Sequence, residues 1–125
     1  MRTLTLRDAL RLHELLLAAT GGTAGVRDVG TLESALYHAY ASFDGKDLYP
    51  TIEEKAARQA YAIVRNHAFV DGNKRMGLLV MLTFLESNGI KLAFESAELV
   101  ELGLGVAAGS IDAGQVLAWI QEHKV

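Results

Sequence analysis

The chain has 125 residues, of which 50% are hydrophobic and 22% are charged, and these proportions exclude a disordered or fibrous protein. Its 12 basic and 15 acidic side chains give a formal net charge of −3 without an overall basic footprint, so we expect no direct DNA binding. Cysteine is absent, which excludes disulfides and thiolate metal sites and fits a reducing compartment.

Neither a signal peptide nor a membrane span is indicated. The first residues, MRTLTLRDAL, lack the uninterrupted apolar segment of a signal peptide. The longest apolar run, Met76–Leu85, has about half of the roughly 20 residues that a span requires. We therefore expect a cytoplasmic protein without a membrane partner, folded as one domain over residues 1–125.

The first half of the chain reads as two helices and a loop. Apolar residues at helical spacing predict a helix over residues 6–19, which Gly21 and Gly22 end. Thr31 is the expected N-cap of a second helix, which ends near Ser42. The segment FDGKDLYP, residues 43–50, is predicted to be a loop because it contains Asp-Gly and the only proline.

The second half predicts four more helices. Thr51 to Glu54 match a capping box for a third helix that runs to His67. Residues 74–87 are apolar nearly all round, as expected at the centre of a bundle, and Asn88-Gly89 ends that helix. The short extended piece IKLAF, residues 90–94, is predicted to pair with the Tyr49 region, and Ser96 and Asp112 are the expected N-caps of the last two helices. The fold class is therefore all-α, with about six helices around a buried central helix and at most a small β-hairpin.

One polar stretch, NHAFVDGNKR at residues 66–75, lies between two apolar helices. The first N–H groups of a helix form an anion site, and Gly72 lets a ligand approach that backbone closely. Lys74 and Arg75 are cations at the positive end of the helix dipole, which implies an anion such as phosphate. Asp71 is suited to hold Mg²⁺ against phosphates, and His67 can accept a proton from a hydroxyl near neutral pH.

Each of these residues also has a plainer interpretation. His67 can be a C-terminal helix cap, and Asp71 with Gly72 can be only a turn. Asn73 can be an N-cap, and Lys74 and Arg75 can be solvated surface charges. Their coincidence within nine residues, with cations at the unfavourable helix end, favours a phosphate site.

The stretch HAFVDGNKR resembles the Fic motif, His-Pro-Phe-x-(Asp/Glu)-Gly-Asn-(Gly/Lys)-(Arg/Lys). Lysine at the motif's second glycine position is similar to the Doc (death on curing) toxin branch of that family. Three other segments also look like Doc sequences: residues 21–36, 48–57 and 105–112. The similarity extends over nearly the whole chain.

The resemblance implies an all-helical Fic fold and a toxin kinase that uses ATP and Mg²⁺ to phosphorylate a threonine of elongation factor Tu, arresting translation. It also implies a Phd-like antitoxin as an inhibitory partner. Carried over to this sequence, the resemblance makes His67 the general base, Asp71 the Mg²⁺ ligand and Phe69 a structural residue. The residues that it implies for phosphate or nucleotide binding are Arg65, Gly72, Asn73, Lys74 and Arg75. It also implies a flap that docks the target beside the nucleotide, formed by Asp47, Leu48 and Tyr49.

Some positions depart from the family pattern. Leu78 replaces the second arginine of Fic proteins that transfer AMP, and Leu79 replaces an asparagine of Doc proteins. Ala68 replaces the motif proline. The alternatives to a kinase are an AMP-transferase, disfavoured by Lys74 and Leu78, and a catalytically silent module that binds nucleotide or peptide.

Overall fold

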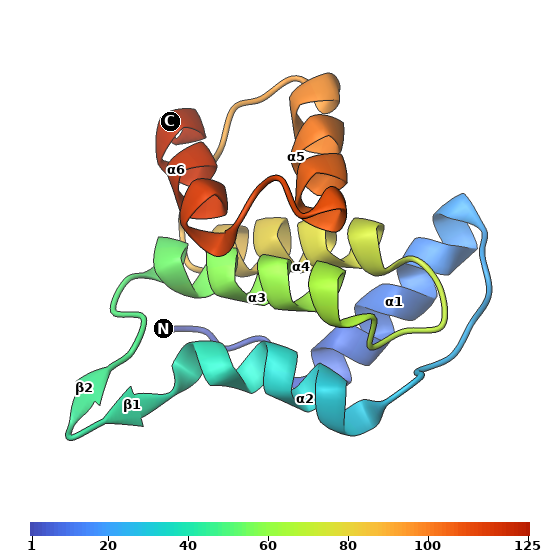
Figure 1. Cartoon of the computed structure of the whole chain (residues 1–125), viewed down its shortest axis with the longest axis horizontal. Helices are drawn as coiled ribbons and strands as arrows, with labels where there is room; N and C mark the ends of the chain where they lie inside the picture. Colours follow the sequence, from blue (N-terminus) through green and yellow to red (C-terminus); the bar gives the residue numbers. More distant parts are fainter.

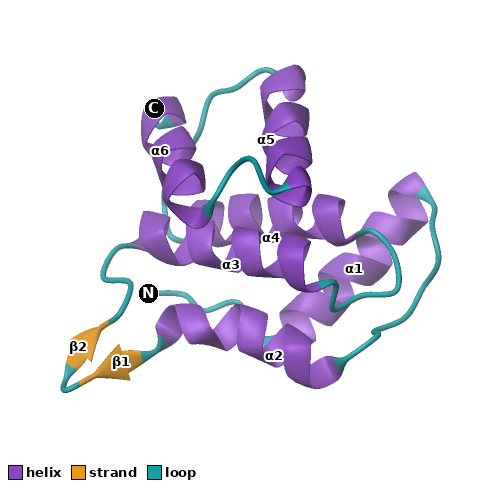
Figure 2. Cartoon of the chain, viewed as in Figure 1, coloured by secondary structure: helices purple, strands orange, loops and turns teal.

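The computed structural model describes residues 1–125, and α-helices dominate it (Figures 1 and 2). In chain order the elements are α1 (Leu6–Thr20), α2 (Val29–Tyr37), a 3₁₀ turn (His38–Tyr40), β1 (Ser42–Phe43), β2 (Lys46–Asp47), α3 (Ile52–Asn66), α4 (Asn73–Ser87), α5 (Ser96–Ala108) and α6 (Ala113–His123). The predicted all-α fold with six helices is confirmed.

Most helix starts follow from capping side chains that the sequence shows. Thr51 accepts the N–H of Glu54 and begins α3, although the reciprocal bond of a full capping box is absent. Asp112 begins α6 in a complete capping box with Gln115. These two N-caps were predicted correctly.

Two predicted N-caps are wrong. Asp28, not Thr31, caps α2, because its carboxylate accepts the N–H of Thr31 at 3.1 Å. The helix α5 begins after Glu95 rather than with Ser96 as its cap, and the Glu98 carboxylate accepts the N–H of Glu95 at 2.9 Å. In both helices an acidic side chain, and not the predicted hydroxyl, makes the hydrogen bond at the helix start.

The small hairpin forms within residues 42–47, and the predicted pairing of IKLAF with the Tyr49 region is wrong. Ser42 pairs with Asp47 and Phe43 with Lys46 around Asp44 and Gly45, which have φ of 52° and 76°. Two successive residues at positive φ make the tight turn that matches strand twist, and Asp-Gly is suited to it. Leu92, from IKLAF, bridges instead to Lys124 at the C-terminus.

The core centres on α3 and α4, which lie side by side and antiparallel (Figure 1). The helix α3 also contacts α2, α5 and α6, and α4 contacts α1 and α5. A Cβ on Gly77 of α4 would lie 2.5 Å from Cγ2 of Val64 and 3.0 Å from the carbonyl oxygen of Ala60, so a glycine permits this close packing. The side chains of Leu78, Leu79 and Leu82 are partly buried against the core, so one side of α4 is only partly covered.

The C-terminus is fastened to the start of α5. Nε2 of His123 lies 2.7 Å from the Glu98 carboxylate, and Nδ1 lies 2.7 Å from the carbonyl of Trp119. Both partners accept, so both ring nitrogens carry protons and the imidazole is a cation. Accordingly, the Glu98 carboxylate and then the Trp119 carbonyl raise the pKa of His123, while the bond from His123 and then the N–H of Glu95 lower the pKa of Glu98.

Every helix is too short or too polar to cross a lipid bilayer.

Candidate active site

The loop between α3 and α4, residues 67–72, begins in a left-handed conformation. His67 follows α3 as its C-cap with φ 51° and ψ 49°. This region disfavours residues with a Cβ by about 1 kcal/mol or more, so contacts in the following residues must hold it. The His67 side chain is exposed. His67 is therefore a helix cap by its backbone while its ring remains available to a ligand.

The next two residues anchor the loop. Phe69 is 1% exposed and belongs to the core cluster. The carbonyl of Ala68 accepts the N–H of Arg27 at 2.8 Å and that of Asp28 at 3.2 Å. The burial of Phe69 and the two hydrogen bonds to Ala68 together fix the backbone on the C-terminal side of the left-handed residue His67.

A second segment, residues 20–28, lies along the loop, and the sequence did not indicate it as part of the site. The N–H of Val70 donates to the carbonyl of Gly25 at 3.0 Å, and the N–H of Thr23 donates to Oδ2 of Asp71 at 2.9 Å. A Cβ on Gly22, which has φ of 125°, would lie 2.6 Å from Oδ2 of Asp71. The glycines of this segment are the signal that could have revealed so close an approach.

His13 of α1 contacts the same loop through Phe69 and Asp71. It is 4% exposed, stacks on Phe69 at 4.0 Å between ring centroids, and its Nε2 lies 2.9 Å from the carbonyl oxygen of Asp71. A carbonyl only accepts, so Nε2 carries the proton and donates it. The sequence showed His13 only as one residue of a helical pattern, whereas the structure makes it a support of the loop.

Asp71 and Arg75 form a pair in the structure. Nη2 of Arg75 lies 3.8 Å from Oδ1 of Asp71, and Nη1 donates to the hydroxyl of Thr20 at 2.5 Å. The N–H of Thr23 and then that of Gly72 donate to the Asp71 carboxylate and lower its pKa, with a further contribution from Arg75. Asp71 is therefore ionised, and 43% of its side chain is exposed.

The helix α4 begins without a side-chain cap. Gly72 is the N-cap residue, with φ of 80°, and it has no side chain to accept the first N–H groups. The amide of Asn73 does not serve as a cap, because it donates to and accepts from the backbone of Phe69, at 2.9 Å in each case. The start of α4 therefore keeps free N–H donors at the positive end of its dipole.

Lys74 adds an unpaired charge at this helix start. Its side chain is exposed and makes no salt bridge within 4 Å. A Cβ on Gly103 of α5 would lie 3.2 Å from Cγ of Lys74 and 2.9 Å from Cδ1 of Leu78, so the small residue makes room for both side chains. Lys74 thus brings its own charge to the start of α4, and the next turn, at Leu78, carries none.

Arg65 is placed differently from the other predicted phosphate ligands. Its Nη1 donates to the carbonyl of Ala107 at 2.9 Å. That carbonyl lies in the last turn of α5, where a cation interacts favourably with the helix dipole. The structure gives Arg65 this capping contact between α3 and α5.

The predicted flap does not lie beside His67. Asp47, Leu48 and Tyr49 precede the N-terminus of α3, whereas His67 follows its C-terminus, and a 15-residue helix is about 22 Å long (Figure 1). The buried ammonium of Lys55 donates to Asp47 at 3.1 Å and also to the Tyr49 carbonyl, so both groups fasten the hairpin to α3. The segment that does adjoin the site is residues 20–28.

These residues fit a magnesium-bound phosphate. Mg²⁺ typically takes one or two protein carboxylates together with substrate phosphates, and Asp71 offers one ionised, half-exposed carboxylate. No group of three or more histidine and carboxylate side chains is arranged to hold a metal by itself. The free donors of α4 and the charge of Lys74 suit the phosphates.

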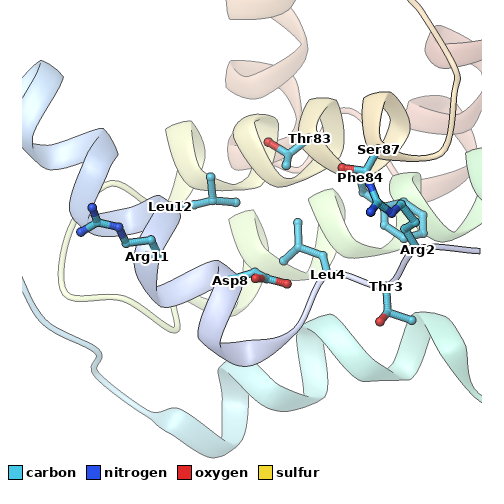
Figure 3. A pocket seen from close by; sticks show the side chains of 9 residues that line it. All are labelled: Arg2, Thr3, Leu4, Asp8, Arg11, Leu12, Thr83, Phe84 and Ser87. Carbon is cyan, nitrogen blue, oxygen red and sulfur yellow. The ribbon is translucent and has the colours of Figure 1, made fainter.

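A separate cavity of about 470 Å³ lies between the N-terminal segment, α1 and the far end of α4 (Figure 3). Leu4, Leu12 and Phe84 are its apolar lining residues, and Arg2, Asp8 and Arg11 are charged residues that line it. The α4 residues that line it begin at Thr83, about 15 Å along the helix from Asn73. The cavity is therefore distinct from the His67 loop.

The geometry defines a helical protein in which a polar loop leads into a helix start with free N–H donors, and comparisons with known proteins identify its family. Residues 3–85 match the Fic/DOC family. The protein kinase doc of Escherichia phage P1 is 32% identical over 116 residues, 93% of this chain and 90% of that protein. Toxin Doc of Mycolicibacterium smegmatis is 45% identical over 75 residues, 60% of this chain and 58% of that protein. The chain belongs to the Fic/DOC family, in its Doc branch.

Proposed function

We propose that the protein is the toxin of a toxin–antitoxin pair and acts as an ATP-dependent kinase on a threonine of elongation factor Tu, arresting translation. The observation that carries the proposal is the uncapped start of α4 with Lys74, next to the exposed ring of His67. The names of the two relatives, a toxin and a protein kinase, support the same class of function.

The phosphate side of the reaction would rest on α4 and Asp71. Bound ATP and Mg²⁺ would supply the phosphoryl group and neutralise its charge. Asp71 would hold the metal, and the backbone N–H groups of Asn73 and Lys74, with the Lys74 ammonium, would hold the phosphates beside Gly72, whose own N–H is bonded to Asp71. Asn73 would contribute its backbone N–H, since its side chain is bonded to Phe69. The Arg75 guanidinium, which lies 3.8 Å from the Asp71 carboxylate in the structure, would change partner from that carboxylate to phosphate.

The hydroxyl side would rest on His67. Its ring would accept the proton of the target hydroxyl as the oxygen forms its bond to phosphorus and the bond to the leaving oxygen breaks. Such a base must stay accessible to a protein substrate, and the exposure of His67 meets this requirement. The left-handed backbone would point the ring away from the helix that precedes it.

A His67→Asn variant tests this role without disturbing the fold. Asparagine tolerates a left-handed backbone better than most residues, so the unfolding temperature of the variant should equal that of the unaltered protein. Growth arrest on expression should be lost. A variant that folds normally and arrests growth as strongly would contradict the proposed base.

A Phd-like antitoxin would provide the restraint. Half-exposed apolar side chains lie on α1 and α5, which both pack on α4: Leu15, Val100 and Leu104. An amphipathic helix is the usual partner of such a surface, and a disordered antitoxin tail can fold as one on binding. Leu104→Asp should weaken the affinity for the antitoxin measured by calorimetry, while expression of the variant should still arrest growth.

A further inference from the structure

Three surface cavities follow α3, and the first two lie along the line where it packs on α2. One of about 600 Å³ is lined by Thr31 and Ser34 of α2 and Asn66 of α3, among others. The next, about 240 Å³, shares Ser34 and Asn66 and adds His38 and Arg58. A third, about 160 Å³, shares Arg58 and continues between α3 and α6 to Tyr49 at the hairpin. Because neighbouring cavities share lining residues, they form one trough, here called the α2–α3 trough.

The trough ends at the candidate active site. Asn66 directly precedes His67, and the first cavity has no hydrophobic lining residue. The second has only two, both alanines. The Asp28 carboxylate, which caps α2, also lines the first cavity. A polar lining of this kind suits the main chain of a polypeptide better than an apolar helix.

Arg58 gives the trough a fixed and unneutralised charge. Its guanidinium carbon lies 5.6 Å from the ring centre of Tyr49 and 5.9 Å from that of Tyr61. Arg58 takes part in none of the salt bridges, although Glu54, one turn earlier, lines the third cavity with it. Two rings hold the planar group in place while it lines both the second and the third cavity. A held arginine with free donors is suited to a carboxylate.

We infer that the α2–α3 trough binds an extended segment of the target protein, with the reacting hydroxyl at His67 and an acidic side chain at Arg58. The inference rests on the proposed function, of which it specifies the substrate. Asn66 and Arg58 are eight helical residues apart, about 12 Å, and an extended chain covers about 3.3 Å per residue. The acidic residue therefore lies about four positions from the modified threonine or serine.

Steady-state kinetics with purified elongation factor Tu and radiolabelled ATP test the charge contact. Arg58→Glu should raise KM for the protein substrate by about tenfold or more, because a charge-assisted contact is replaced by repulsion. KM for ATP should not change. Arg58→Met retains the stem without the reversed charge and should show a smaller rise, and Arg7→Glu, on exposed α1, is the matched control. Unaltered KM in both Arg58 variants would overturn the inference.

Photo-crosslinking tests the same contact without turnover. A benzophenone amino acid at position 34 should crosslink to elongation factor Tu, whereas one at position 33, on the same helix but outside the trough, should not. A protein that transfers no phosphate but crosslinks only at position 34 contradicts the proposed kinase and retains the trough. Transfer with equal crosslinking at both positions overturns the trough and retains the kinase.

Discussion

Replacing His13 should loosen the active-site loop without touching any group that meets substrate. The His13 side chain donates to the Asp71 carbonyl at 2.9 Å and stacks on Phe69 at 4.0 Å. His13→Leu removes both contacts. The unpaired carbonyl costs about 1–3 kcal/mol and the lost ring pair about 0.5–1.5 kcal/mol, so the free energy of unfolding should fall by about 1.5–4.5 kcal/mol.

Two further variants separate the contacts. His13→Phe keeps the stacked ring and loses the hydrogen bond, whereas His13→Gln keeps a donor and loses the ring. At about 4 °C per kcal/mol for a chain of this length, His13→Phe should unfold roughly 4–12 °C lower. We also expect kcat for phosphate transfer to fall well below that of the unaltered protein at temperatures where the variant is folded, since Asp71 moves with its carbonyl.

Thermal unfolding followed by circular dichroism, with transfer kinetics at 20 °C, provides both readouts. His13→Phe with unchanged unfolding temperature and unchanged kcat would refute the supporting role. A lower unfolding temperature with unchanged kcat would leave His13 a packing residue only.

Two other outcomes follow from the packing and the charges. Gly77→Ala should destabilise by about 2–3 kcal/mol in urea unfolding, because the added methyl meets the backbone of Ala60. Gly114→Ala, whose added methyl would lie in ordinary contact with Oδ1 of Asp112 at 3.4 Å, should be neutral or stabilising; equal effects would contradict the close helix contact. The His123–Glu98 pair should stabilise most between pH 4.5 and 6.5, the ordinary pKa values of its members. Because the pKa of His123 is raised in the folded protein, the stability that His123 contributes is lost as pH rises through its folded-state pKa. Because the pKa of Glu98 is lowered, the stability that Glu98 contributes is lost as pH falls through its folded-state pKa. Unfolding curves of His123→Gln should therefore differ from those of the unaltered protein near pH 5.5 and converge with them at alkaline pH; a constant gap would exclude the ion pair as the cause.

Helices were predictable because their signals are local. Apolar spacing and the capping residues Thr51 and Asp112 lie within a few positions of the structure that they specify. The cap of α2 was predicted at Thr31, whereas Asp28, three residues earlier and also a capping residue type, makes the bond. The hairpin was assigned to the wrong partner, although Asp44-Gly45 with short flanks is itself a hairpin signal.

The candidate site was predictable only where it is contiguous. Residues 67–75 carry the motif, and their placement between two helix ends follows from the helices on either side. His13 meets Asp71 across 58 positions, and no local pattern encodes such a contact. Residues 20–28 reach the loop through backbone hydrogen bonds, which nearly any side chain permits, so only their glycines offered a signal.

The central claim is that the uncapped start of α4, with Lys74 in the motif, serves transfer of the terminal phosphate to a hydroxyl activated by His67. The direct measurement is incubation of the protein and elongation factor Tu with ATP labelled at either the α or the γ phosphorus, alongside His67→Asn. Label from γ only, absent in the variant, is the predicted result. Label from α would contradict the kinase and indicate AMP transfer, and equal γ labelling by the variant would contradict the role of His67.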